Sequence, residues 1–140
     1  MSRPTICTTE VTNEVCQRLA GGESLRKICE DEALPVMSSI LLWVVSGRLV
    51  EGTEKEFSEH YMQAREAAGF SHADRVADVA VRALDEGLDP QVARAAMDGF
   101  KLAAERMSPK KHSPRQEVDL RSPDGSMTPT RTNLDDFYSK

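Results

Sequence analysis

Few side chains in this 140-residue sequence have the type and spacing that catalysis or metal binding requires. His60, His72 and His112 have no second histidine or cysteine at ligand spacing, and Cys16 and Cys29 lie far apart without a Cys-x-x-Cys motif. The sequence also lacks the glycine-rich phosphate loop of nucleotide-binding proteins and the Gly-x-Ser-x-Gly motif of hydrolases. We therefore expect no catalytic residues, no metal site and no cofactor, and a protein that is not an enzyme.

The other chemistry open to this sequence is contact with DNA. Lys and Arg neutralise phosphates, and short polar side chains can reach base edges. The first 50 residues offer candidate contacts of both kinds, namely Arg3, Arg18, Arg26, Lys27, Ser38, Ser39 and Arg48. Segment 36–45 contains no Lys or Arg, so only its two serines and Met37 could touch base edges.

Three short helices would position these side chains. Thr8 or Thr9 can cap the first helix, which Gly21-Gly22 ends, and Ser24 can cap the second. The third runs from about Val36 to Val45. Residues at helical spacing face a common core: Val11, Val15, Leu19, Leu25, Ile28, Cys29, Ile40, Trp43 and Val44. This order of elements, in which a short second helix and a turn lead to a third helix, is typical of a helix-turn-helix unit. A plain three-helix bundle gives the same pattern.

The middle of the chain, residues 51–110, predicts an antiparallel helical hairpin. One apolar stripe begins at Phe57 and Tyr61 and runs to Leu84, and a second runs from Val92 to Met107. Glu86-Gly87 ends the first helix, and Asp89-Pro90 opens the second. Two helices cannot bury both stripes against each other, so we expect this hairpin to be an oligomerisation domain.

Residues 111–140 form a third, basic segment rich in proline and serine. Pro109, Pro114 and two later prolines predict that no helix forms after Ser108. Val118 and Leu120 alternate with polar residues before a turn, which predicts a small β-hairpin and then a flexible tail. Lys110, Lys111 and Arg115 are candidate DNA or channel contacts or a solvated surface run. Leu134, Phe137 and Tyr138 are either a docking peptide for another protein or disordered.

The net charge of −5 is distributed unevenly along the chain. Residues 1–50 carry five basic and six acidic side chains, residues 51–105 carry six and twelve, and residues 106–140 carry seven and five. The acidity therefore belongs to the hairpin and does not exclude DNA as a partner. No apolar run is long enough for a membrane span, the first ten residues lack the apolar region of a secretory signal, and the odd number of cysteines suits a reducing cytoplasm.

Several motifs together resemble the small terminase subunits of tailed bacteriophages. They occur in the family's order and cover most of residues 10–112: Gly22-Glu23-Ser24-Leu25-Arg26-Lys27-Ile28-Cys29, Leu34-Pro35, Ser38-Ser39-Ile40 with Trp43, Phe57 with Tyr61 and Ala64, and Phe100-Lys101-Leu102-Ala103-Ala104-Glu105-Arg106-Met107-Ser108-Pro109-Lys110-Lys111. The sequence departs from the family where a basic residue usually precedes the tryptophan, because that position is Leu42. We therefore expect each module to bind weakly and affinity to come from several modules on one duplex.

The resemblance implies a non-enzymatic protein of viral genome packaging. Such a protein assembles as a homo-oligomeric ring, here of roughly eight to ten copies, around a helical core. It binds the packaging site of concatemeric double-stranded viral DNA in the host cell cytoplasm and delivers that DNA to the large ATPase and nuclease subunit. Strands near Val118 and Leu120 fit the small intersubunit barrel that the family often adds.

Two other functions are compatible with the same elements. One is a dimeric helix-turn-helix regulator of transcription, which would protect a compact palindromic operator instead of an extended region. The other is a scaffold protein that makes no DNA contact. For Trp43 we expect a place in the core of the three-helix unit rather than a contact with DNA.

Overall fold

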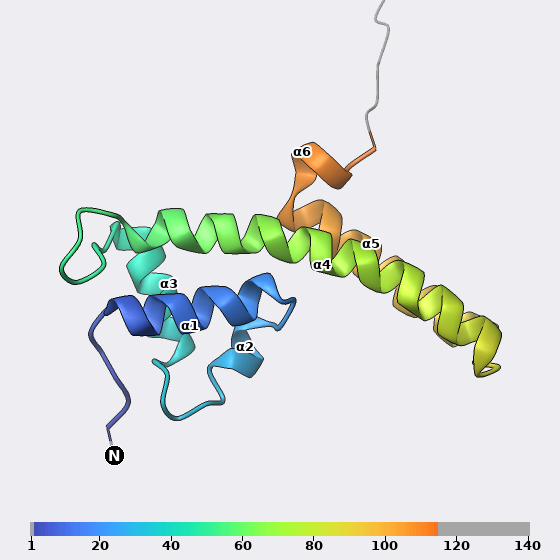
Figure 1. Ribbon diagram of the computed structural model, residues 1–140, viewed down its shortest axis with the longest axis horizontal. Helices are drawn as coiled ribbons and strands as arrows, with labels where there is room; N and C mark the ends of the chain where they lie inside the picture. The colour runs from blue at the N-terminus through green and yellow to red at the C-terminus, as the bar shows by residue number, and fades with distance from the viewer. Residues whose placement is uncertain (1, 115–140) are drawn as a thin grey trace, which may run out of the picture.

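The computed structural model describes residues 2–114, and in this part of the chain six helices follow one another without a sheet (Figure 1). They are α1 (Thr9–Ala20), α2 (Leu25–Ile28), α3 (Met37–Ser46), α4 (Phe57–Asp85), α5 (Pro90–Met107) and α6 (Pro109–His112). The prediction of a mainly helical fold with a helix-turn-helix unit and a helical hairpin is confirmed. The predicted strands near Val118 and Leu120 lie outside the described residues. None of the helices within residues 2–114 has the length and apolar character needed to cross a membrane.

The helix ends follow the capping signals of the sequence. The Thr8 hydroxyl accepts a hydrogen bond from the Val11 N–H at 3.2 Å, and the Ser24 hydroxyl accepts one from the Lys27 N–H at 3.2 Å. The Asp89 carboxylate likewise caps α5, where it accepts hydrogen bonds from the backbone N–H groups of the second and third helical residues at 2.8 and 3.1 Å. Each cap satisfies donors that the first helical turn leaves without an internal partner.

One hydrophobic core joins the N-terminal helices to the start of α4. Figure 1 shows α1 to α3 gathered beside the first half of α4, while α5 returns along the second half. The buried core residues come from both sides of residue 50: Cys7, Val15, Leu19, Ile28, Cys29, Leu34, Ile40, Trp43, Val50, Phe57, Tyr61 and Ala64. The core therefore crosses the predicted domain boundary between residues 50 and 51, and the first turns of α4 belong to the helix-turn-helix unit as much as to the hairpin.

The hairpin is closed by small side chains. Ala93 and Ala104 of α5 are buried, as are Ala68 and Gly69 of α4. A Cβ atom added to Gly69 would lie 2.9 Å from the Cβ of Ser108, a separation that real Cβ atoms almost never show. Gly69 therefore allows the end of α5 to approach α4 closely.

A short helix follows the hairpin, so the prediction that no helix forms after Ser108 is wrong. The backbone N–H groups of Lys111 and His112 donate to the Ser108 carbonyl at 3.1 and 3.0 Å. Pro109 occupies the first helical position, where no N–H is required, and for that reason it does not prevent this single turn. Lys111 forms an ion pair with Glu66 of α4 at 2.6 Å and so fastens α6 to the long helix.

Candidate nucleic-acid interface

The third helix of the N-terminal unit, α3, is held in place by the buried residues on one of its sides. Ile40 is fully buried, and Trp43 is 5% exposed. The prediction that Trp43 lies in the core is confirmed: its ring packs edge-on against Phe57 of α4 with the centroids 5.5 Å apart. Because buried residues hold one side of α3, its other side is presented outward.

A left-handed glycine ends α3 and turns the chain sharply. Gly47 has φ 65°, and its N–H donates to the Trp43 carbonyl. The following residues form a narrow turn, in which the Val50 N–H donates to the Lys55 carbonyl at 2.9 Å and the Phe57 N–H donates to the Arg48 carbonyl at 2.8 Å. These hydrogen bonds hold Arg48 directly beyond the end of α3.

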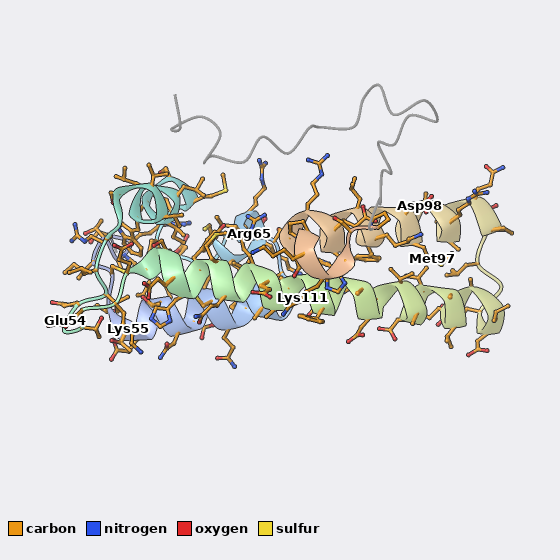
Figure 2. All side chains as sticks on the ribbon, turned by 90° about the horizontal axis from the view of Figure 1, so that it is seen from above. Glu54, Lys55, Arg65, Met97, Asp98 and Lys111 are labelled. Carbon is orange, nitrogen blue, oxygen red and sulfur yellow. The ribbon has the colours of Figure 1, made fainter. Side chains whose placement is uncertain are left out.

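The turn between α3 and α4 was not foreseen from the sequence. Leu49 and Glu56 form an isolated antiparallel bridge at its base, and Figure 2 shows Glu54 and Lys55 at its far end, near one end of the molecule. Lys55 is exposed and adds a cation close to the end of α3, although its position in the sequence falls within the predicted hairpin segment, residues 51–110. Gly52, with φ 75°, was the available signal for a tight turn.

The outward side of α3 is apolar and uncharged. Leu41 is 40% exposed, Leu42 is 63% exposed and Val45 is 85% exposed. Ser38 is exposed on the same side, and Ser39 is half-buried, so Ser38 is the better placed of the two serines predicted to meet base edges. No charged residue occurs anywhere in α3.

Three of the predicted cations are exposed around this helix. Arg26 and Lys27 lie on α2, the helix immediately before the turn that leads to α3, and Arg48 follows α3. Figure 1 shows α2 and α3 in the same group of helices, on one side of α4. Exposed cations therefore come shortly before and directly after α3 in the chain, where they could contact phosphates on either side of a groove, and the exposed carboxylates of Glu30 and Glu32 lie in the turn between α2 and α3.

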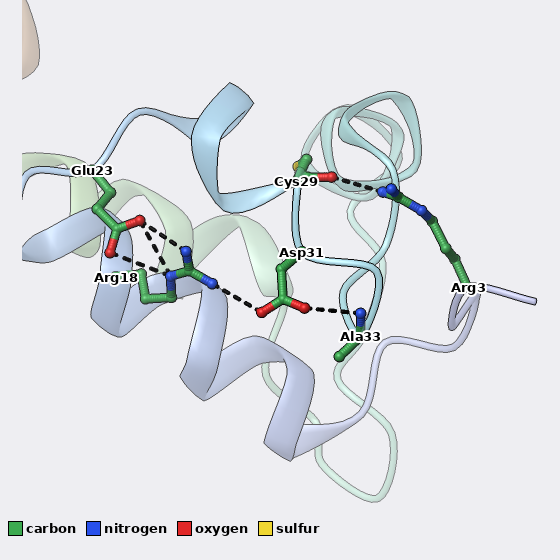
Figure 3. A network of polar contacts seen from close by, with 6 residues as sticks. All are labelled: Arg3, Arg18, Glu23, Cys29, Asp31 and Ala33. Carbon is green, nitrogen blue, oxygen red and sulfur yellow. Dashed lines mark hydrogen bonds and ion pairs between the residues drawn. The ribbon is translucent and has the colours of Figure 1, made fainter. Parts of the chain in front are cut away.

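The other two predicted cations are engaged within the chain. Arg18 pairs with Glu23 at 2.9 Å and with Asp31 at 3.2 Å, and Arg3 donates to the Cys29 carbonyl at 2.7 Å (Figure 3). The hydrogen bond from Arg18, then its positive charge, lowers the pKa of Glu23, although desolvation acts in the opposite sense. These contacts tie α1 and the N-terminal arm to the turns on either side of α2, so both arginines position the unit.

The unit is also fastened to α4 by two residues that the sequence did not single out. The Ser71 hydroxyl donates to the Ala20 carbonyl at 2.8 Å, which satisfies the end of α1. The Arg75 guanidinium lies over the Phe100 ring, 5.6 Å from its centroid. It also lies close to Gly22, which has φ 94°, because a Cβ atom added to Gly22 would be 3.3 Å from a guanidinium nitrogen of Arg75. The orientation of the three-helix unit relative to the hairpin is therefore set by specific contacts.

The second predicted basic cluster is separate from the first. Lys110 is exposed, whereas Lys111 is paired with Glu66 and lies 5.0 Å from the centroid of the Phe70 ring. Figure 1 shows α6 on the side of α4 opposite to α1 to α3, and Figure 2 marks Lys111 on α6. Arg115 lies outside the described residues, as do Leu134, Phe137 and Tyr138. The structure thus does not bring Lys110 and Lys111 together with the cations near α3.

Burial affects two of the described histidines and cysteines, His72 and Cys16, most clearly. No three His, Cys, Asp or Glu side chains within residues 2–114 are grouped so that they could hold a metal ion. His72 is buried between α4 and α5 and stacks on Phe100, and burial, followed by the charge of Arg75, lowers the pKa of His72. Burial, followed by the nearby Cys7, raises the pKa of the Cys16 thiol to about 11.

Comparisons with known proteins agree on one family. A family model described as "Bacteriophage Sf6, terminase small subunit-like" matches residues 7–119. A crystal structure of the terminase small subunit gp1 of the bacterial virus Sf6, with a single substitution, is 27% identical with a TM-score of 0.66, over 87% of this chain and 94% of that chain. Two further single-substitution variants of gp1 are each 28% identical with TM-scores of 0.63, over 87% of this chain and 88% of theirs. No curated protein matches the sequence.

Proposed function

Since this chain belongs to the family of terminase small subunits like that of bacteriophage Sf6, we propose that it recognises viral DNA for genome packaging. Membership in the family gives the chain the role of a small terminase subunit of a phage, a kind of protein that generally has no catalytic activity of its own. The finer role that we propose is to bind the packaging site of concatemeric viral DNA in the host cytoplasm. The chain then delivers that DNA to the large ATPase and nuclease subunit.

The observation that carries the DNA-binding proposal is the position of Arg26, Lys27 and Arg48. These exposed cations lie before and after α3 in a helix-turn-helix unit. In such a unit the third helix enters the major groove while neighbouring residues contact the backbone. Arg3 and Arg18 support the interface indirectly, because their contacts hold the N-terminal arm and α1 in place.

Assembly into a ring is supported by the outer surface of the hairpin. Met62 and Val81 of α4 and Val92 and Leu102 of α5 are all more than half exposed. An apolar surface spread along both helices favours packing against further copies of the chain, and repeated head-to-tail contacts close into a ring. Native mass spectrometry at micromolar concentration should find one large homo-oligomer, and we expect roughly eight to ten copies. A population of monomers and dimers alone would exclude the ring.

The remaining proposed contacts involve the C-terminal region. We propose that Lys110 on α6 meets DNA or lines the ring channel, and we assign the same role, from the sequence alone, to Arg115, which lies outside the described residues. Leu134, Phe137 and Tyr138 would dock on the large subunit. Deletion of residues 133–140 should then abolish stimulation of the large subunit's ATPase while ring mass and DNA affinity stay unchanged.

The DNA-binding proposal is tested by a charge reversal with a matched control. Arg26→Glu with Lys27→Glu removes two phosphate contacts, so we expect weaker binding to duplex DNA and a salt slope of log affinity smaller by about 2. Arg94→Glu with Lys101→Glu makes the same charge change at exposed positions of α5 and should change the slope much less. Fluorescence anisotropy titrations at KCl concentrations from about 50 to about 300 mM measure the DNA affinity and its salt slope for each double variant. Equal slopes for the two double variants would refute the proposed interface.

A further inference from the structure

The exposed surface of α3 is unusual for a helix in this position of a helix-turn-helix unit. Ser38, Leu41, Leu42 and Val45 follow one another at helical spacing and form one stripe, which we name the α3 face. Leu42, near its centre, is 63% exposed and Val45, at its C-terminal end, is 85% exposed, so two branched apolar side chains face outward. The face contains one hydroxyl group and no charge.

Charge around the α3 face favours a duplex nucleic acid as its occupant. Arg26 and Lys27 on α2, shortly before α3 in the chain, and Arg48 directly after α3 are exposed, so they can neutralise phosphates. The face itself has no carboxylate that would repel DNA. The apolar stripe therefore has cations before and after it in the chain that can meet the phosphate backbones on either side of a groove, while the exposed carboxylates of Glu30 and Glu32 in the turn between α2 and α3 keep the net charge there low.

The side chains of the α3 face limit what they can recognise in that groove. Guanine and adenine are usually read by the paired hydrogen bonds of Arg, Lys, Asn or Gln, and the face has none of these residues. The apolar group that the bases present in the major groove is the C5-methyl group of thymine. Leu41, Leu42 and Val45 can cover such methyl groups, and the Ser38 hydroxyl can donate or accept one hydrogen bond at a neighbouring base edge.

We propose that the α3 face is a thymine-methyl reader, and that Leu42 and Val45 make the chain prefer duplexes with thymine methyl groups in the contacted major groove. This inference rests on the proposed DNA-binding function and adds its chemical specificity. Removing one methyl group from water favours binding by about fourfold, so a single module discriminates weakly. Several modules of one oligomer on one duplex multiply that preference.

The test compares two duplexes that differ only in methyl groups. One A·T-rich duplex of about 40 base pairs, long enough for several modules, is prepared with thymine and the other with uracil at every thymine position. Anisotropy titrations with the full chain at one KCl concentration give the ratio of the two affinities. We expect the thymine duplex to bind at least about fourfold more tightly. Equal affinities, with the salt dependence of DNA binding retained, would overturn the thymine preference and leave the proposed function intact.

Matched variants separate a DNA contact from other roles of the face. Leu42→Ala with Val45→Ala should bring the affinity ratio close to one, and both positions are exposed, so the helical circular dichroism should not change. Ile6→Ala is the control, because Ile6 is also an exposed apolar residue, at 52%, but lies before α1, outside both α3 and the hairpin, and it should keep the full ratio. If the double variant keeps the ratio and lowers the oligomer mass, the α3 face is a protein interface and the inference is wrong. If neither duplex binds the unaltered chain, the DNA-binding function fails together with the inference.

Discussion

The ring of Trp43 meets the ring of Phe57 edge-on, with their centroids 5.5 Å apart and their planes at 79°. Trp43 is the last buried residue of the candidate DNA-contacting helix, and Phe57 is the first residue of the long hairpin helix. Phe57 in turn packs on Tyr61, one turn further along α4, with the centroids 5.9 Å apart. This row of aromatic rings makes the three-helix unit and the start of α4 one packed body, so movement of α3 relative to the hairpin would disrupt the core.

Replacement of Phe57 should unfold both parts of the molecule together. Phe57→Ala removes a fully buried ring and should lower the free energy of unfolding by about 3–5 kcal/mol. The chain has one tryptophan, so urea unfolding followed by Trp43 fluorescence reports on this core, and circular dichroism reports on all helices. Both transitions should shift together. Phe70→Ala, at a 47% exposed ring of the same helix, should cost clearly less. A shift in fluorescence alone would contradict the single-body interpretation.

Two glycines within helices should respond to alanine in opposite ways. Gly69→Ala places a methyl group 2.9 Å from the Cβ of Ser108, and we expect this overpacking to destabilise the hairpin by about 1–3 kcal/mol. Gly99→Ala meets nothing within 4 Å and should stabilise α5 by about 0.5–1 kcal/mol through helix propensity. Thermal unfolding of both variants measures the difference. A stabilising Gly69→Ala would mean that α4 and α5 lie further apart than described.

Replacement of Arg18 should change the thermal stability of the chain more than its binding to DNA. Arg18→Met leaves Glu23 and Asp31 without their ion-pair partner and should lower the thermal midpoint at low salt, with a smaller loss at high salt because salt screens the pairs. The salt slope of DNA binding should stay near that of the unaltered chain. Arg26→Met should show the reverse pattern, with a reduced slope and little change in midpoint. If Arg18→Met reduces the slope as much as Arg26→Met, then Arg18 contacts phosphate directly.

His72 should make the hairpin less stable in mild acid. Burial, and then Arg75, lowers the pKa of His72 in the folded chain from its ordinary value of 6.5. The unfolded chain then takes up a proton that the folded chain resists, so stability is complete above pH 6.5 and is lost as the pH falls below it. The slope should not exceed about 1.4 kcal/mol per pH unit. Urea unfolding at pH 7.5 and about pH 5.5 measures the loss. His72→Gln should flatten it, whereas His60→Gln should not.

Cys16, a residue of α1 that packs against the hydrophobic core, should react slowly with thiol reagents. Burial raises the pKa of Cys16 from 9.0 to about 11, so its thiolate is the minor form at pH 8. Because the thiolate is the reacting species, the native chain should react about a hundredfold more slowly at this site than the unfolded chain. Labelling at pH 8 with and without denaturant, followed by peptide mass spectrometry, measures the ratio. Equal rates would show that Cys16 is not protected.

The sequence by itself determined the helices α1 to α5 and most of their ends. Thr8, Ser24 and Asp89 cap helices through hydrogen bonds to residues at most three positions away, and Gly47 ends α3 without help from distant residues. Such signals can be read in a sequence because both partners are near neighbours in the chain. The order of these elements, with the family motifs, was also sufficient to identify the family and to predict a helix-turn-helix unit with a hairpin.

Only the tertiary structure decided what the individual side chains do. Arg18 and Arg26 look equivalent in the sequence, yet Asp31 reaches Arg18 across thirteen positions, whereas Arg26 stays exposed. The helix α6 likewise depends on Glu66, which is far away in the sequence. Pairings of this kind depend on how helices pack, and packing brings together residues whose separation no local pattern encodes. The same packing buried Trp43 and turned the opposite, apolar side of α3 outward.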